Sequence, residues 1–181
     1  QGNIDIDLSA ARLNCLFAVT QTLEESRIFK SVSLLDVCQN KEGTFWHKNL
    51  LTQQQTDSLC EYYQVDAILS LEQLVIYDIV ENFLTTDEDY YAYLQAFQTS
   101  VWSLQYADGR KHQDFTLVDT LIWEGRAYTR ENAIQQLPDR KTALLDMSTY
   151  VGEKSALALL PLWETTDRYI YEDASEAMQK G

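Results

Sequence analysis

The chain of 181 residues has few of the residues that nucleotide-binding and nucleophilic sites require. It contains six glycines and two histidines, and it has no GxGxxG or GxxxxGK motif. A glycine-rich phosphate-binding loop is therefore disfavoured. Nucleophilic catalysis usually needs an activating base. His112 follows a predicted turn, and His47 has no GxSxG elbow to serve, so we expect no catalytic histidine.

Cysteine and basic residues are also scarce. Cys15, Cys38 and Cys60 stand at wide spacings, which fit neither a disulfide framework nor a CxxC metal site. We expect each to be a small buried hydrophobe, with no disulfide within the chain. The 14 Lys and Arg residues form no basic stripe, and the formal net charge is -14. This charge argues against a nucleic-acid partner and for a self-repelling surface.

Long apolar runs and calcium-loop spacing are missing as well. No stretch approaches the about 20 uncharged apolar residues that span a bilayer, and the first residues show no signal-peptide pattern. Either the protein is cytoplasmic or processing has removed a signal. The acidic run at residues 85–91 lacks the Asp-x-Asp-x-Asp-Gly spacing of a calcium loop. We expect neither a metal nor a cofactor.

The clearest local pattern is a β-hairpin. Trp102, Leu104 and Tyr106 stand at every second position, and residues 108–109 are Asp-Gly, which suits a two-residue type I′ turn. Counting back from the turn places Trp102 opposite Phe115. The apolar residues of the return strand then share the face of Trp102, and Gln105 is on the opposite face. They are Phe115, Leu117, Leu121 and Trp123.

Asp119 interrupts this apolar face. It is either a functional acid held in a hydrophobic surround, or a carboxylate that reaches a hydrogen-bond donor or water at a frayed or bulged strand end. We favour the second interpretation.

Periodicity predicts two helices and one strand before the hairpin. The first helix spans residues 9–26, with Ser9 as N-cap, and residues 29–37 read as a strand followed by a loop at residues 36–43. A capping box at residues 52–55 begins a second helix, which ends near Gln64. The apolar face predicted for the first helix consists of Leu13, Leu16, Phe17, Thr20 and Leu23.

Two further strands complete the predicted sheet. Residues 66–77 alternate and then shift phase between Leu71 and Leu74, which indicates a bulge or a strand covered on both faces. Residues 89–97 fit either a helical face or a strand, and their aromatic content favours a strand. The fold class is therefore α/β (α+β), a mostly antiparallel sheet with helices packed on it, in a domain spanning residues 1–127.

Residues 128–181 read as a helical segment. Thr129 can cap a short helix reaching Leu137, and Pro138 suits the first turn of a longer helix that Pro161 ends or kinks. Another helical stretch follows at residues 163–171. Such helices can begin a helical-repeat array.

Aromatic residues give the strongest sign of an interaction surface. Eleven Tyr and four Trp exceed what a core of this size requires, and Tyr combines apolar area with a hydrogen-bonding tip. Half-buried strand and helix faces also favour Tyr, so a purely structural role stays open. Paired carboxylates of a glycosidase stay open too, with Glu72, Asp119 and Glu124 as candidates. The candidate interaction residues are Tyr90, Tyr91, Tyr93, Tyr169 and Tyr171.

Three places in the sequence carry a family resemblance. They are residues 66–72 (DAILSLE), residues 123–125 (WEG), and residues 137–140 (LPDR) together with 160–163 (LPLW) and Arg168-Tyr169. In these the chain resembles a lipoprotein family of Bacteroidetes whose function is not established. The resemblance implies an α/β domain similar to the lipoprotein domains of curli-secretion and peptidoglycan-synthase activators, followed by tetratricopeptide-like helices. It supplies no catalytic residues.

The resemblance also implies a cellular setting. The parent protein would be exported and lipid-anchored, with its signal peptide, anchor cysteine and first strand before Gln1 and further repeats after Gly181. It would lie on the periplasmic or cell-surface side of the outer membrane and meet the membrane only through that anchor. We therefore expect a non-catalytic interaction or scaffold domain of the cell envelope, whose partners are other envelope proteins or further copies of itself. A carbohydrate-active or other hydrolase is the alternative.

Overall fold

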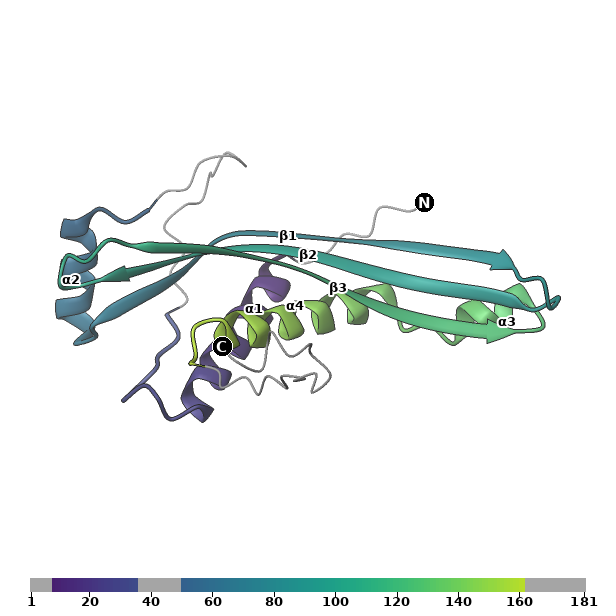
Figure 1. Ribbon diagram of the computed structural model, residues 1–181, viewed down its shortest axis with the longest axis horizontal. Coiled ribbons are helices and arrows are strands. Elements are labelled where there is room, and N and C mark those ends of the chain that lie inside the picture. Colours follow the sequence, from purple (N-terminus) through teal and green to yellow (C-terminus); the bar gives the residue numbers. More distant parts are fainter. Residues whose placement is uncertain (1–7, 36–49, 162–181) are drawn as a thin grey trace, which may run out of the picture.

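A computed structural model describes residues 8–35 and 50–161 as a long three-stranded antiparallel sheet with its two long helices packed on one face (Figure 1). The strand order β1-β2-β3 follows the chain, so β2 is central and β3 is an edge. This confirms the predicted mixed α/β class and its antiparallel sheet. The elements are α1 (Leu8–Glu25), α2 (Gln53–Tyr63), β1 (Ala67–Leu84), β2 (Tyr90–Tyr106), β3 (Gln113–Ala127), α3 (Arg130–Gln135) and α4 (Arg140–Leu157).

The strand register matches the sequence prediction closely. Trp102 pairs with Phe115, and their rings stack with centroids 6.3 Å apart and planes 11° from parallel. The predicted bulge in β1 is present as a register shift between Leu71 and Gln73. Residues 90–97 form a strand, as their aromatic content indicates. A predicted bulge at Asp119 is wrong, because the pairing of β2 with β3 runs through it without a shift.

The turn between β2 and β3 differs from the predicted type I′ turn. Gly109 has a φ of +74°, but Asp108 lacks the positive φ that type I′ needs at both central residues. β2 instead ends at Tyr106, and β3 begins at Gln113. The carboxylate of Asp108 accepts a hydrogen bond of 3.1 Å from the backbone N–H of Arg110. Since an Asp side chain can close such a turn itself, the loop is wider while the register is kept.

The core lies between the sheet and the two long helices, α1 and α4. One cluster joins Leu94 of β2 to Leu144 and Met147 of α4. A second cluster joins Trp102 to Cys15 of α1 and Ala156 of α4. The sheet face that these helices cover is called the covered face. Asp78 of β1 lies on this face and binds Arg140 at the start of α4 through two hydrogen bonds, one of them 2.8 Å long.

The buried face of α1 agrees with the predicted one only in part. Leu23 is buried and Leu16 packs against the cluster around Trp102, whereas Leu13 is exposed and Phe17 is 63% exposed. The helix crosses α4 so closely that a Cβ at Gly152 would lie 2.4 Å from the carbonyl oxygen of Cys15. Small side chains at the crossing permit that approach, and Phe17 lies on the outer side of the helix. The residues that α1 buries are Ala11, Cys15, Ala18, Val19 and Leu23.

The predicted helix ends are confirmed in part. The capping box at residues 52–55 and the Thr129 cap are confirmed. Ser9 lies inside α1 and is not its N-cap. Asp139 caps α4, so Pro138 precedes the helix, which ends at Leu157 before Pro161 is reached.

Residues 29–35 do not form the predicted strand. Val32 packs against the cluster around Trp102, on the helical side of the sheet, so this β-rich segment meets no strand edge with which to pair. Residues 36–49 and 162–181 lie outside the described residues. The predicted loop at 36–43 and the helical stretch at 163–171 fall there.

Candidate functional site

The most distinctive surface is the sheet face that points away from α1 and α4, which we call the open face (Figure 1). No described helix lies over its long central part. Even so, it carries large apolar side chains, including Tyr77 at 51%, Val118 at 69% and Ile122 at 55% exposure. From the strand register, its residues are Gln73, Val75, Tyr77, Ile79, Glu81 and Phe83 of β1, Tyr91, Tyr93, Gln95, Phe97, Thr99 and Val101 of β2, and Thr116, Val118, Thr120, Ile122, Glu124 and Arg126 of β3.

Aromatic rings form a ladder along the open face. Tyr77 and Phe97 are direct cross-strand partners, and their rings stack with centroids 4.8 Å apart and planes 12° from parallel. Further along the same two strands, the Phe83 and Tyr91 rings lie 5.3 Å apart, and Tyr91 lies 6.3 Å from Tyr93. Cross-strand aromatic pairs stabilise a sheet, but here their outer sides face solvent. The ladder therefore offers a preformed apolar strip.

Two carboxylates flank this strip in a single cross-strand row. Glu81 of β1 and Glu124 of β3 pair with Tyr93 from opposite sides. The Tyr93 hydroxyl donates a 2.5 Å hydrogen bond to Glu81, and the Tyr91 hydroxyl donates to Glu124. Because each hydroxyl is held by a carboxylate, the pKa of both tyrosines is raised. The hydroxyl protons stay in place at neutral pH, and the carboxylates keep further acceptor positions for a ligand.

The end of the open face near the β1–β2 turn is strongly acidic. Among the described residues at this end, the Arg126 guanidinium contacts two of the acidic side chains. It lies 3.1 Å from Asp87 and 2.9 Å from Asp89. The acidic run of the sequence is therefore used in part to hold Arg126. Within residues 8–35 and 50–161, no group of three His, Cys, Asp or Glu side chains is placed to hold a metal ion.

The predicted interaction tyrosines separate into three groups. Tyr91 and Tyr93 lie on the open face, whereas Tyr90 pairs with Leu84 and Ala127 and points to the covered face. Tyr169 and Tyr171 lie outside the described residues. The clustering of tyrosines in the sequence does not single out the other members of the ladder, Tyr77, Phe83 and Phe97. Their signal was the period of two in β1 and β2 on the face opposite Trp102.

The candidate carboxylates of a glycosidase are not brought together. Asp119 lies on the covered face, and Glu124 lies on the open face. Glu72 is at the bulge of β1, many residues along the sheet from the row that holds Glu124. The carboxylate nearest to Glu124 along that row is Glu81, which the sequence analysis did not single out.

Asp119 and Gln136 occupy backbone groups at the edge of β3. The Asp119 carboxylate accepts a 2.8 Å hydrogen bond from the N–H of Thr120. The Gln136 amide accepts from the N–H of Arg126 at 3.1 Å and donates to its carbonyl at 3.0 Å, as a neighbouring strand would. Because inward and outward groups alternate along a strand, the even-numbered residues of β3 present their N–H and C=O groups to the edge. Asp119 therefore accepts a hydrogen bond as predicted, and its donor is the next residue of its own strand.

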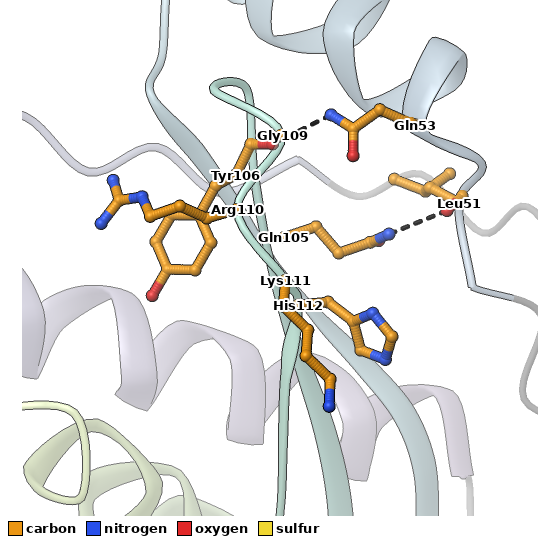
Figure 2. A pocket seen from close by; sticks show the side chains of 8 residues that line it. All are labelled: Leu51, Gln53, Gln105, Tyr106, Gly109, Arg110, Lys111 and His112. Atoms are coloured by element: carbon orange, nitrogen blue, oxygen red, sulfur yellow. Dashed lines mark hydrogen bonds between the residues drawn. The ribbon is translucent and has the colours of Figure 1, made fainter.

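A small cleft of about 230 Å³ lies at the other end of the sheet, where α2 meets the β2–β3 loop (Figure 2). The Gln105 amide donates a 2.8 Å hydrogen bond to the Leu51 carbonyl, and the Gln53 amide donates one of 3.2 Å to the Tyr106 carbonyl. These two hydrogen bonds connect α2 and the segment before it to the hairpin. The basic side chains do not converge on the cleft. Figure 2 shows Arg110 turned over the Tyr106 ring, 4.3 Å from its centroid, and away from Gln105.

The other residues considered in the sequence are the cysteines and histidines. Cys15 and Cys60 are free and buried, as predicted, and Cys38 lies outside the described residues, as does His47. The ring of His112 is partly exposed and lies 3.8 Å from the Asp114 carboxylate. Burial raises the pKa of the Cys15 thiol to about 12, against a smaller opposing effect of the Gln98 amide. Such a thiol is protonated and unreactive at neutral pH.

The comparisons with known proteins give one match. A family model described as a domain of unknown function, DUF8603, matches residues 4–171. No curated protein and no solved structure matches the chain. Among the described helices, none is both long enough and apolar enough to cross a membrane.

Proposed function

The chain belongs to the DUF8603 family, and we propose that it is a non-catalytic interaction domain that binds a partner protein on the open face of its sheet. The observation that carries this proposal is the exposed aromatic ladder. Tyr77, Phe97 and their neighbours lie on a rigid three-stranded frame whose opposite face is already covered by helices. A contiguous apolar patch of this kind usually marks an interaction surface.

The geometry of the ladder favours recognition of a broad, flat partner. Tyr offers large contact area at low cost in side-chain entropy, and its hydroxyl gives orientation. In the open face the rings are already fixed by stacking and by the hydrogen bonds to Glu81 and Glu124. Such preorganisation reduces the ordering cost of association.

A hydrolytic role has one specific feature in its favour, the row in which Glu81 and Glu124 flank Tyr93. Hydrolysis by paired carboxylates needs an acid and a base that enclose the scissile bond. Here both carboxylates are exposed on an open sheet, each already accepts a tyrosine hydroxyl, and neither lines the cleft of Figure 2. We therefore prefer binding to hydrolysis.

The setting in the cell envelope is part of the proposal and rests on the family resemblance. An exported, lipid-anchored parent would place the open face in the periplasm or at the cell surface. The full-length coding sequence tests this point. An upstream signal peptide with a cysteine for lipid attachment supports it, and a coding sequence that begins directly at residue 1 with no such segment opposes it.

Site-specific photo-crosslinking in the native host tests the proposed binding. A photoreactive phenylalanine analogue at Val118 should give a discrete adduct with another protein, whereas the same analogue at exposed Phe17 of α1 should not. Tyr77→Ser should abolish the adduct, and Tyr62→Ser, on the exposed surface of α2, should leave it. Equal adducts from positions 118 and 17 would refute the proposal. Glycoside or peptide hydrolysis that Glu81→Gln and Glu124→Gln both abolish would replace it with the hydrolase.

A further inference from the structure

The open face differs in charge along its length, and this difference indicates the chemistry of its partner. At the β1–β2 end of the sheet, the strands and the turn carry five carboxylates and the Arg126 guanidinium. Arg126 is engaged by Asp87 and Asp89, so its charge is locally satisfied. Among the described residues, the partners of Glu81 and Glu124 are neutral tyrosine hydroxyls. The carboxylates at this end are Glu81, Asp87, Glu88, Asp89 and Glu124.

We propose that the open face binds a cationic amphipathic helix of the partner protein, an inference that rests on the proposed function. The apolar stripe of that helix would pack on the aromatic ladder. Its Lys or Arg side chains would reach Glu81 and Glu124 on either side of Tyr93. Cationic groups are also attracted to the faces of aromatic rings, which Tyr91 and Tyr93 supply beside those carboxylates.

A helix fits this surface better than a strand. A strand docks by pairing with unsatisfied backbone groups, and these lie at the edges of a sheet, not on its face. The covered face shows what the sheet accepts, since α1 and α4 pack there. The apolar side chains of β1 on the open face run from Val75 to Phe83, which is roughly 27 Å at about 3.4 Å per residue. A helix of about 18 residues has that length.

Charge argues against two other occupants. A second copy packed through the same face would bring together two chains that each carry a formal net charge of -14. Like charges brought together in this way oppose association. An anionic lipid surface meets the same repulsion.

Titration with synthetic helices tests the inference on the 181-residue chain. The probe is a stapled 18-residue helix with a leucine stripe flanked by lysines, and its partner probe carries glutamate in place of lysine. We expect the lysine helix to bind at least about tenfold more tightly than the glutamate helix, as measured by fluorescence anisotropy. Equal binding of the two helices would overturn the charge argument.

Matched charge variants separate docking from general attraction to an acidic protein. Glu81→Gln with Glu124→Gln should weaken the lysine helix by about tenfold, whereas Glu24→Gln with Glu25→Gln, which changes the net charge equally at the end of α1, should change it less than about twofold. An equal loss in both double variants refutes the site.

The crosslinking experiment at Val118 distinguishes failure of this inference from failure of the proposed function. If Val118 crosslinks to a different protein but the lysine helix does not bind selectively, the helix inference is wrong and the proposed binding face stands. An adduct with the mass of two chains identifies a second copy as the occupant, which overturns the inference. A Val118→Cys variant that resists maleimide in the folded monomer would mean that the chain covers its own face, which also overturns it.

Discussion

Gly152 of α4 lies against Cys15 of α1 with no room for a side chain between them. A Cβ at position 152 would be 2.4 Å from the Cys15 carbonyl oxygen and 2.8 Å from the Cβ of Ala18. Backbone atoms of a packed helix cannot move aside as the end of a flexible side chain can. The close crossing of the two helices on the covered face therefore depends on this glycine.

Gly152→Ala should destabilise the protein although alanine is the better helix former. The gain in helix propensity is about 1 kcal/mol, and forcing a methyl group into a packed crossing typically costs more than that. We expect a net loss of roughly 1–3 kcal/mol in the free energy of urea unfolding. Glu153→Ala, one residue along on the exposed side, should change it by less than about 0.5 kcal/mol. A Gly152→Ala variant as stable as its parent would contradict the close crossing.

Trp102→Ala should remove the largest fully buried side chain of the sheet. Trp102 is stacked on Phe115 in the cluster with Cys15 and Ala156, so its loss leaves a cavity costing roughly 3–5 kcal/mol. Val118→Ala on the open face should cost far less, because that side chain is mostly exposed. Thermal and urea unfolding check both values. A Trp102→Ala variant that melts within a degree of its parent would contradict the assignment of the faces.

Gln105 requires a correction to what the sequence suggests. Its position on the sheet face opposite Trp102 predicts that it tolerates substitution by threonine. In the fold it is only 7% exposed, and its amide donates 2.8 Å to the Leu51 carbonyl under α2. Gln105→Thr should therefore cost roughly 1–2 kcal/mol by urea unfolding. A neutral result would mean that α2 is held without this amide.

The sequence predicts best where local chemistry decides the structure. The Trp102–Phe115 register, the bulge after Leu71 and the Thr52 capping box follow from side-chain alternation and from hydrogen bonds within a few residues. The face of α1 was predicted only in part, because the approach of α4 at Gly152 places small residues such as Ala11, Cys15 and Ala18 in the core beside Leu23. The open face was partly predicted. Tyr91 and Tyr93 stand out in composition, whereas Tyr77 and Phe97 become a site only when β1 and β2 pair.

The buried Cys15 thiol should make stability depend on pH above neutrality. Its pKa is raised from 9.0 to about 12 by burial, so between these values the unfolded chain has lost a proton that the folded chain keeps. The folded state then binds more protons, and stability falls as pH rises, by at most about 1.4 kcal/mol per pH unit. Below pH 9 the thiol is protonated in both states and contributes nothing to the slope.

Comparison with Cys15→Ala isolates this contribution. Between pH 8 and pH 10.5, the parent should lose about 1–2 kcal/mol more unfolding free energy than the variant, since other titrating groups are common to both. Urea unfolding at the two pH values gives the difference. Parallel losses in the parent and in Cys15→Ala would mean that the thiol is less buried than the fold indicates.

Asp119 should limit pairing of β3 with other strands. Its carboxylate occupies the N–H of Thr120, which otherwise points outward from an edge strand between the exposed side chains of Val118 and Ile122. Unpaired groups beside apolar side chains are the features that promote edge-to-edge association, and an inward-pointing charge is a common protection. Asp119→Ala removes the acceptor and frees the N–H, so self-association should become at least about tenfold tighter than in the parent.

Sedimentation velocity over a concentration series measures this association. Asp119→Asn is the matched control, because its side-chain oxygen can still accept from Thr120, and it should behave as the parent does. Gln136→Ala, which exposes the N–H and C=O of Arg126 at the end of the same edge, should add to the effect of Asp119→Ala. If Asp119→Asn and Asp119→Ala associate equally, loss of the negative charge is responsible and the hydrogen bond to Thr120 is not. If neither variant associates more than the parent, the edge of β3 is protected by other means.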